Sequence, residues 1–194
     1  MKIGVLSIQG AVSEHLDMLI ECGMDGLGVK KPADFSDLDG LIIPGGESTT
    51  ISRLAKRYGI IPEIKRMAAE GKPIMGTCAG QILLASDVEG QEGLLSLMDI
   101  TVRRNAFGRQ KESFEEDLLI AGIEEDPYRC IFIRAPIITR VGPQVEVLAS
   151  YGEGVVAARQ ANILALSFHP ELTSDLRMHK YFLSLTKDAF LKQA

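Results

Sequence analysis

Short apolar runs that alternate with amphipathic segments are the feature that most restricts how this chain can fold. Four such runs occupy the first half of the sequence: residues 2–8, 26–30, 39–43 and 73–76. The segments between them have apolar residues at helical spacing. Because a parallel sheet covered by helices buries both kinds of segment, the pattern predicts an α/β fold: an open, mostly parallel sheet with helices on both faces.

Signals for helix starts and ends fall between the apolar runs. In the first helical segment Ser13 is a candidate N-cap and Gly23 a candidate end, and the residues expected on the buried side are Leu16, Leu19 and Ile20. We expect the next helix to begin at Ser48 or Thr49, after the turn Pro-Gly-Gly. A further helix is expected over 80–86.

The second half of the chain is richer in β-like runs. These runs are joined by turns of glycine, proline, asparagine and aspartate, and they cover residues 99–104, 130–138, 145–150, 154–159 and 163–168. A final amphipathic helix is expected over about 175–190, with an apolar stripe formed by Leu176, Phe182, Leu183 and Phe190. Since no repeat or linker interrupts the 194 residues, we predict one domain over residues 1–194 with a β-rich second half.

Composition argues against several classes of partner. The formal charge is −5, from 26 acidic and 21 basic residues, and no Lys/Arg run exceeds two, so we expect no nucleic-acid partner. No stretch approaches the ~20 apolar residues of a membrane helix, and the apolar start is too short for a signal peptide, so we expect no membrane association and a cytoplasmic chain. Three widely spaced cysteines, Cys22, Cys78 and Cys130, form neither a disulfide framework nor a metal pair, so we expect reduced thiols.

Cys78 stands between two glycines in the sequence GTCAG, residues 76–80. Glycines at −2 and +2 suit a sharp strand-to-helix turn, in which backbone meets backbone and the central side chain stands above the sheet edge. A helix N-terminus also favours a thiolate, so Cys78 is a candidate nucleophile. The alternative is a buried packing cysteine, which is what most cysteines of this kind are. The motif alone leaves both readings open.

A thiol nucleophile needs a base, and the chain has three histidines. His15, in the first helix, is predicted to be solvated or to face a partner, and His179 is predicted to be a structural residue of the last helix. His169 follows an apolar run at a strand end and precedes Pro170 and Glu171, and the proline holds the segment stiff. His169 is therefore the candidate base, and Glu171 the candidate carboxylate that orients it. An exposed turn carboxylate is the alternative for Glu171.

The sequence PGGESTT, residues 44–50, is the third element of the candidate site and is again expected between a strand and a helix. Its two glycines let backbone N–H groups point outward, as in an oxyanion hole or a phosphate-binding turn. It lacks the GK[ST] ending of a P-loop and the GxGxxG of a dinucleotide fold. Together with Cys78 it favours acyl transfer, in which the N–H groups of Gly46 and Ala79 hold the developing oxyanion.

The order PGGEST, GTCAG, SFHPEL resembles that of class I (triad) glutamine amidotransferases. Longer blocks narrow the resemblance to the glutaminase subunits of two-subunit pyridoxal 5′-phosphate synthases: GVLSIQGAVSEH, PGGESTT, GTCAGQILLA, RRNAFGRQKESFE, FIRAP and SFHPELT. The matching blocks run from residue 4 to 173 in the family's order. RNAFGRQ and FIRAP are far more specific than the triad itself.

The resemblance implies a class I glutamine amidotransferase-like fold and hydrolysis of L-glutamine to L-glutamate and ammonia. It makes Cys78 the nucleophile that forms a γ-glutamyl thioester, His169 the proton relay and Glu171 the residue that orients His169. The residues that it implies at the glutamine site are Gly46, Glu47, Ser48, Arg104, Ile133 and Arg134. A guanidinium group suits the carboxylate end of an amino acid, although a surface ion pair is the alternative for any one arginine. The chemistry requires no metal and no bound cofactor.

The same resemblance implies a partner that consumes the ammonia. This partner is a (β/α)₈-barrel synthase subunit, which builds pyridoxal phosphate, in a complex of twelve glutaminases around a dodecameric synthase. A barrel typically takes ~250 residues, so a chain of 194 residues cannot also contain it. The segment QGAVSEH is expected at the partner surface.

Two other functions stay open on the sequence. A glutaminase that feeds another acceptor, such as the imidazole glycerol phosphate branch of histidine synthesis, shares the triad but not the RNAFGRQ and FIRAP blocks. A stress-type cysteine hydrolase or a non-catalytic relative fits a cysteine elbow alone, but the pairing of His169 with Glu171 argues against it.

Overall fold

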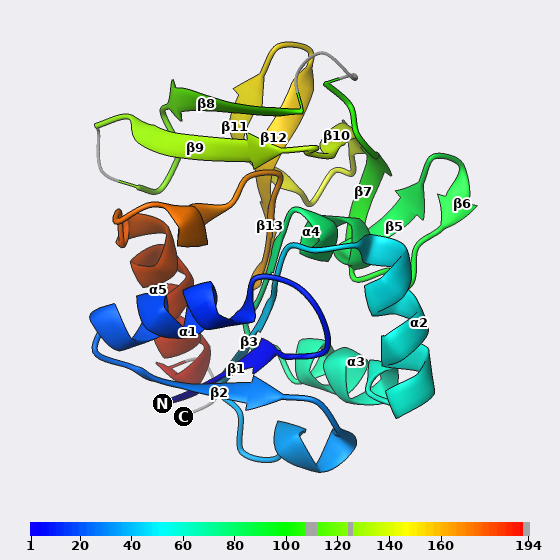
Figure 1. The fold of residues 1–194 in the computed structure, drawn as a ribbon, viewed down its shortest axis with the longest axis vertical. Helices are drawn as coiled ribbons and strands as arrows, with labels where there is room; N and C mark the ends of the chain where they lie inside the picture. Colours follow the sequence, from blue (N-terminus) through cyan, green and yellow to red (C-terminus); the bar gives the residue numbers. More distant parts are fainter. Residues whose placement is uncertain (108–111, 124–125, 192–194) are drawn as a thin grey trace.

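A computed structural model describes residues 1–107, 112–123 and 126–191 of the chain. An eleven-stranded sheet has the order β2-β1-β3-β4-β13-β12-β10-β7-β5-β6, and β11 pairs with β12 beside this path. A separate two-stranded hairpin, β8 with β9, lies above one end of the sheet in Figure 1. Residues 108–110 of the RNAFGRQ block lie outside the described residues.

Five neighbouring strands make the parallel part of the sheet: β2 (Asp25–Val29), β1 (Lys2–Leu6), β3 (Gly40–Ile43), β4 (Ile74–Thr77) and β13 (Ile163–Leu166). Their side chains alternate between two hydrophobic cores. On β3, for example, Leu41 and Ile43 belong to one core and Ile42 to the other. Because both faces are buried, these strands read as short continuous apolar runs, which is the pattern that predicted them.

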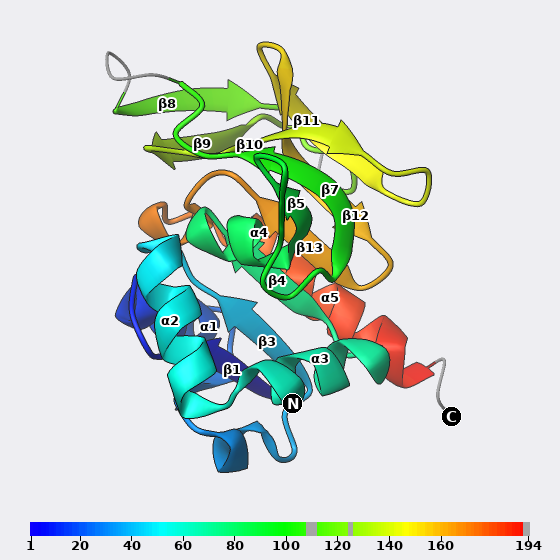
Figure 2. The ribbon, with the colours of Figure 1, turned by 90° about the vertical axis from the view of Figure 1, so that its right-hand side faces the viewer.

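Helices cover both faces of this parallel part (Figure 2). Residues of α1 (Val12–Glu21) and α5 (Arg177–Leu191) pack into one core, and residues of α2 (Ser48–Tyr58), α3 (Ile61–Ala69) and α4 (Ala79–Leu84) pack into the other. The predicted α/β architecture is confirmed. The start of α2 at Ser48 also agrees, whereas α3 was not among the predicted elements.

Two details of the helices differ from the predictions. Helix α1 begins at Val12 after Ala11, and Ser13 makes no capping bond. Ile20 was expected on its buried side but is 67% exposed, because the residues of α1 that face the sheet are His15, Met18 and Leu19. In α5, Phe182 and Leu183 are buried as expected, while the side chain of Phe190 lies outside the described side chains.

The second half is β-rich, as predicted. It contains β5 (Ala85–Val88), β6 (Gln91–Glu92), β7 (Met98–Arg103), β8 (Ser113–Leu118), β9 (Tyr128–Ile133), β10 (Ile137–Val141), β11 (Glu146–Tyr151) and β12 (Gly154–Gln160), and the 3₁₀ turn η2 (Pro170–Leu172) after β13. A first 3₁₀ turn, η1 (Pro32–Phe35), lies in the first half, before β3. The predicted run 130–138 is two strands, since Arg134 has a φ of +43° and turns the chain between them. The helix predicted over 80–86 ends at Leu84, because Ala85 already pairs with β7.

An aromatic cluster attaches the β8–β9 hairpin to the rest of the molecule. Phe114 and Phe132 stack with ring centroids 4.7 Å apart, and Phe107 and Tyr151 pack against both. This packing places the end of β9 above the carboxyl ends of the parallel strands (Figure 1). Among the described helices, none combines the length and the apolar character that a bilayer span requires.

Candidate active site

Cys78 occupies the sharp turn between β4 and α4. Its backbone has a φ of +49° and a ψ of −102°, a conformation that costs energy for a residue with a Cβ. A Cβ added at Gly76 would lie 2.6 Å from the carbonyl carbon of Gly80, and one added at Gly80 would lie 2.1 Å from the carbonyl oxygen of Ile43. Both glycines are therefore required by close backbone packing around the cysteine, as the sequence predicted.

His169 lies directly beside Cys78. It follows β13, its backbone N–H donates to the Ile131 carbonyl at 2.9 Å, and only 7% of the residue is exposed. Its Nδ1 is 2.7 Å from Oε1 of Glu171. Burial lowers the pKa of His169, but hydrogen bonds with Cys78 and Glu171 outweigh it and raise the pKa to about 10. The ring is therefore cationic at neutral pH, between a thiol and a carboxylate.

Glu171 lies behind His169, in the short turn η2, and is 5% exposed. Burial raises the pKa of this carboxyl, but the hydrogen bond and the positive charge of His169 hold it below its usual value. The alternative of an exposed turn carboxylate is excluded by this position. Cys78, His169 and Glu171 form a line of contacts in the order required of a nucleophile, a base and an orienting group.

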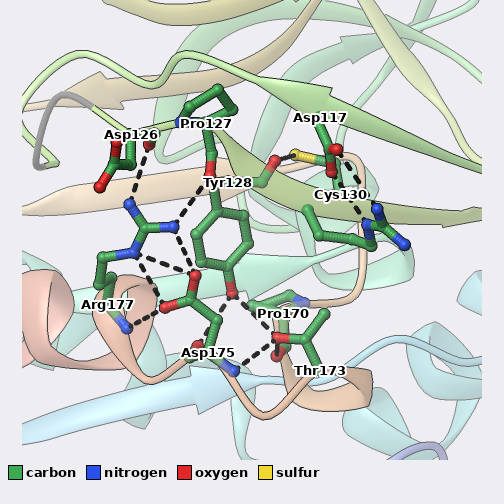
Figure 3. Close-up of polar contacts among 10 residues, drawn as sticks. Asp117, Asp126, Pro127, Tyr128, Cys130, Pro170, Thr173, Asp175 and Arg177 are labelled. Atoms are coloured by element: carbon green, nitrogen blue, oxygen red, sulfur yellow. Dashed lines mark hydrogen bonds and ion pairs between the residues drawn. The ribbon is translucent and has the colours of Figure 1, made fainter.

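A cluster of polar contacts fixes the segment that carries Glu171 (Figure 3). The Arg177 guanidinium binds both carboxylate oxygens of Asp175 and donates to the carbonyls of Asp126 at 2.9 Å and Pro127 at 3.0 Å. The Tyr128 hydroxyl donates to the Asp175 carbonyl at 3.2 Å and lies 3.4 Å from the Thr173 hydroxyl. These contacts join the chain after η2 to β9, so Glu171 sits on a segment anchored at both sides.

The position of His15 overturns the prediction made for it. It was expected to be solvated or to face a partner, yet it is fully buried. Its Nε2 lies 3.4 Å from Oε2 of Glu171 and 3.2 Å from the Thr77 hydroxyl, and its Nδ1 lies 3.0 Å from Nε2 of His179. The cause is the orientation of α1, which turns His15 rather than Ile20 toward the sheet and α5. His179 is buried, as expected of a structural residue of α5.

The turn after β3 lies on the other side of Cys78. The Gly45 N–H donates to the Thr77 hydroxyl at 3.0 Å, and the Gly45 carbonyl accepts from Ala11 N–H at 3.1 Å. Gly45 packs so closely that an added Cβ would lie 2.4 Å from Cε1 of His169. The Glu47 N–H donates to the Gln9 side chain at 2.8 Å. Residues just before α1 therefore hold this turn against the triad.

Glu47 caps α2 with its own side chain. Its carboxylate accepts from the backbone N–H groups of Thr49 at 3.0 Å and Thr50 at 2.6 Å. Hydrogen bonds from Thr49 and Thr50 lower the pKa of Glu47 to about 2, so the group is ionised at neutral pH.

A cavity of about 390 Å³ opens over Cys78. It is lined by all the residues predicted at the glutamine and oxyanion sites, together with two triad members: Gly46, Glu47, Ser48, Ala79, Arg104, Ile133, Arg134, Cys78 and His169. Three lining residues were not predicted: Gln9, Ile82 and Asn105. All three lie inside sequence blocks that carry the family resemblance, so the position in a block was a signal that could have identified them.

The cavity offers charged groups of both signs. Arg104 and Arg134 are the guanidinium groups at its wall, and the Nε of Arg104 is buried with no hydrogen-bond partner among the described residues. Glu47 supplies the negative charge. A site with two guanidinium groups, one carboxylate and a buried thiol at its floor suits a small zwitterionic ligand with an electrophilic group. In the described residues, no cluster of three or more His, Cys, Asp or Glu side chains is placed to hold a metal.

Comparisons with known proteins give one consistent result. The sequence model of the SNO glutamine amidotransferase family matches residues 5–187. The curated protein "Pyridoxal 5′-phosphate synthase subunit PdxT" of Geobacillus sp. is 56% identical over 190 residues, which cover 97% of this chain and 98% of that protein. Its namesake from Halalkalibacterium halodurans is 53% identical over 190 residues, which cover 97% and 96% of the two chains.

Solved structures agree with this result. A crystal structure of a glutamine amidotransferase has 47% identity and a TM-score of 0.90, covering 95% of this chain and 98% of its own. The structure of PurLQS from Thermotoga maritima, at 19% identity, has a TM-score of 0.70 and covers 94% of this chain and 97% of its own, so it shares the fold.

Proposed function

Because the chain belongs to the SNO glutamine amidotransferase family, we propose that it hydrolyses L-glutamine to L-glutamate and ammonia for pyridoxal 5′-phosphate synthesis. The observation that carries this proposal is the line Cys78, His169, Glu171 at the floor of a cavity with two guanidinium groups. The near-complete coverage of curated synthase subunits supports the assignment of the pathway.

The reaction proceeds by two acyl transfers on Cys78. The thiolate attacks the side-chain amide carbon of glutamine, and the N–H groups of Gly46 and Ala79 hold the oxyanion. The protonated His169 gives its Nε2 proton to the departing nitrogen, so ammonia leaves and a γ-glutamyl thioester remains. His169 then accepts a proton from water as the hydroxide attacks the thioester, which releases glutamate and restores the thiolate.

The other cavity residues select the substrate. Arg104 and Arg134 line the cavity, and we propose that they bind the α-carboxylate, since a guanidinium group pairs with a carboxylate by two charge-assisted bonds. Glu47, with Ser48 beside it, and Ile133 line the walls on either side. Glu171 makes no contact with the cavity and acts through His169.

We also propose the partner and the organisation of the complex. The ammonia acceptor is a (β/α)₈-barrel synthase subunit, in an assembly of twelve glutaminase and twelve synthase chains, and this chain contributes one glutaminase domain over residues 1–194. The buried position of His15 narrows the expected partner surface from QGAVSEH to its first part, Gln9–Glu14. The thiols of Cys22, Cys78 and Cys130 are free, which is compatible with the cytoplasm.

The test is to mix the chain with glutamine and measure glutamate and ammonia, alone and with a barrel synthase of the pyridoxal pathway. We expect release that Cys78→Ala abolishes, and pyridoxal phosphate when the synthase receives its sugar phosphates. Stimulation by an imidazole glycerol phosphate synthase instead would assign the other glutaminase branch. Absence of glutamine hydrolysis under all these conditions would favour the hydrolase or binding relative.

A further inference from the structure

Three polar side chains that the proposed reaction does not use lie behind the triad. They are His15 on α1, Thr77 at the end of β4 and His179 on α5, and all three are fully buried. His15 lies between the other two and also reaches Glu171, with the contacts of 3.0 to 3.4 Å given above. Burial of polar side chains costs free energy unless each has a hydrogen-bond partner, so the contacts among these three residues have to offset that cost.

Both histidines of this group are neutral. Burial lowers the pKa of His15 more than the negative charge of Glu171 raises it. Burial also lowers the pKa of His179 to about 3. A neutral imidazole has one N–H group and one bare nitrogen, so the contacts of the two rings decide where each proton lies.

Only one arrangement of protons gives each N–H an acceptor. If both rings carry the proton on Nε2, His179 donates to Nδ1 of His15, and His15 donates to the Thr77 hydroxyl beside Glu171. The opposite arrangement would turn a bare nitrogen of His15 toward the carboxylate. It would also leave the Nδ1–H of His179 buried without an acceptor, because that atom has no partner among the described residues.

We propose that His15 is a positioning residue that couples the triad carboxylate to the Gly45 turn. Its N–H edge faces Oε2 of Glu171, a buried oxygen that accepts no hydrogen bond from the described residues, while Oε1 binds His169. The same N–H donates to Thr77, whose hydroxyl oxygen accepts the Gly45 N–H. One ring thus holds the carboxylate that orients the base and the turn that leads to the oxyanion loop.

The position of His15 along the chain strengthens this role. It lies in the first turn and a half of α1, and residues just before α1 hold the same turn from outside, through Ala11 to the Gly45 carbonyl and Gln9 to Glu47. The Gly45 turn is therefore fixed from both sides by one short stretch of chain. Loss of His15 would remove the contact to Oε2 of Glu171 and, at the same time, the contact to the Thr77 hydroxyl that holds Gly45.

The inference rests on the proposed glutaminase function, and paired substitutions at His15 test it. In His15→Gln the amide nitrogen can replace Nε2, whereas in His15→Asn the amide ends near Nδ1 and loses Thr77 and Glu171. We expect His15→Asn to lower kcat about 10- to 100-fold with little change in KM, as for loss of a buried hydrogen bond to a charged group. His15→Gln should recover most of that loss.

A matched control separates positioning from loss of stability. Leu19 lies one turn further along the buried side of α1 and touches no polar group of the site, so Leu19→Val weakens the same packing. We expect Leu19→Val to keep the wild-type kcat. Equal kcat for His15→Asn and wild type, or equal losses in His15→Asn and Leu19→Val, would overturn the proposal.

A second pair of variants, at Thr77, tests the proposal if His15→Asn does not fold. Thr77→Val removes the hydroxyl that joins His15 to Gly45, and Thr77→Ser keeps it. We expect about a 10-fold lower kcat for the valine variant and near wild-type kcat for the serine variant. Equal rates in the two variants would contradict the proposed coupling.

Two substrate-free readouts keep this inference separate from the proposed function. A nitrogen-15 NMR titration from pH 7 upward reports the pKa of His169, and iodoacetamide reports the reactivity of the Cys78 thiol. In His15→Asn we expect His169 to lose its proton at a lower pH than in wild type and alkylation to be about 10-fold slower, and unchanged values would overturn the role of His15. If the wild-type chain hydrolyses no glutamine with any synthase, the proposed function is wrong. The NMR and alkylation measurements still test the role of His15 in that case.

Discussion

His169 and Glu171 lie on one side of Cys78, buried among side chains of α1, β4 and α5, whereas Gly46 and Glu47 lie on the other side and are exposed. On the buried side, contacts of 2.7 to 3.4 Å link each group to the next. On the exposed side, the turn is held by the Gln9 side chain, the Ala11 N–H and the Thr77 hydroxyl. The comparison shows that the groups of the proposed proton relay are buried within the fold, whereas the turn with the proposed oxyanion donor Gly46 is accessible to a ligand or a partner.

The largest effect is expected from removal of the groups at the centre of the buried side. Cys78→Ala and His169→Asn should each reduce kcat by about 10⁴-fold or more, because nucleophile and base act as a unit. Their thermal unfolding should stay close to wild type, since neither change leaves a large cavity. Glutamate production measured by a coupled assay checks this, and activity within tenfold of wild type in either variant would refute the triad.

A smaller effect is expected on the exposed side, where we propose that the partner binds. In the free chain the Gly45 carbonyl accepts from Ala11, which holds the peptide between Gly45 and Gly46 in one orientation. A synthase that binds residues 9–14 can alter this hydrogen bond and turn the Gly46 N–H toward the oxyanion. One oxyanion donor is worth about 10²–10³ in kcat, so we expect activation of that size on addition of the synthase.

Steady-state kinetics with and without the synthase measure this activation. The difference corresponds to about 3–4 kcal/mol of differential binding, which a protein interface readily supplies. Equal kcat values in the two conditions would mean that the exposed side is already assembled in the free chain. Ala11→Pro removes the N–H that donates to the Gly45 carbonyl, so the kcat of this variant is the control for that hydrogen bond.

Glu171 should contribute less than Cys78 or His169, although it is equally buried. Glu171→Gln keeps the shape of the side chain but removes the charge that stabilises the His169 imidazolium, and we expect about a 10²-fold lower kcat. The loss should appear in kcat more than in KM, because Glu171 makes no contact with the cavity. A variant with kcat near wild type would mean that His15 and the anchored segment position His169 without the carboxylate.

The sequence predicted the parts of this site that depend on local rules. The elbow at Cys78, the strand end at His169 and the glycines of the 44–50 turn carry their geometry in residue type and spacing, and the structure confirms where each lies. Apolar runs likewise predicted the parallel strands, because those strands are buried on both faces.

Other features depend on packing that no local pattern specifies. A polar residue in an amphipathic helix is normally exposed, so His15 was predicted at the surface, but its environment is set by Glu171 and His179, which are more than 150 residues away in the chain. The run 130–138 was read as one strand because the break at Arg134 is a backbone turn within an apolar sequence. Gln9 entered the cavity through the approach of the β1–α1 loop to the 44–47 turn, a tertiary contact.

The smallest expected effect concerns the pH dependence of stability, in which the histidines on the buried side oppose one another. The pKa of His179 falls to about 3 in the folded chain, so below pH 6.5 the unfolded chain binds a proton that the folded chain does not, and stability falls as pH decreases. His15 acts in the same direction, since its pKa is also lowered. His169 acts oppositely, because its pKa is raised to about 10: its contribution is complete below pH 6.5 and is lost as pH rises through 10.

Urea unfolding between pH 7 and pH 5 measures this contribution. Each buried neutral histidine should cost up to about 1.4 kcal/mol of unfolding free energy per pH unit below its unfolded pKa, and carboxylates such as Glu171 steepen the loss only at lower pH. His179→Gln removes one titrating ring while keeping a donor near Nε2, so its stability should fall less steeply over this range than that of wild type. Parallel curves for the two proteins would show that His179 is protonated in the folded chain, and the neutral pair behind the triad would then be wrong.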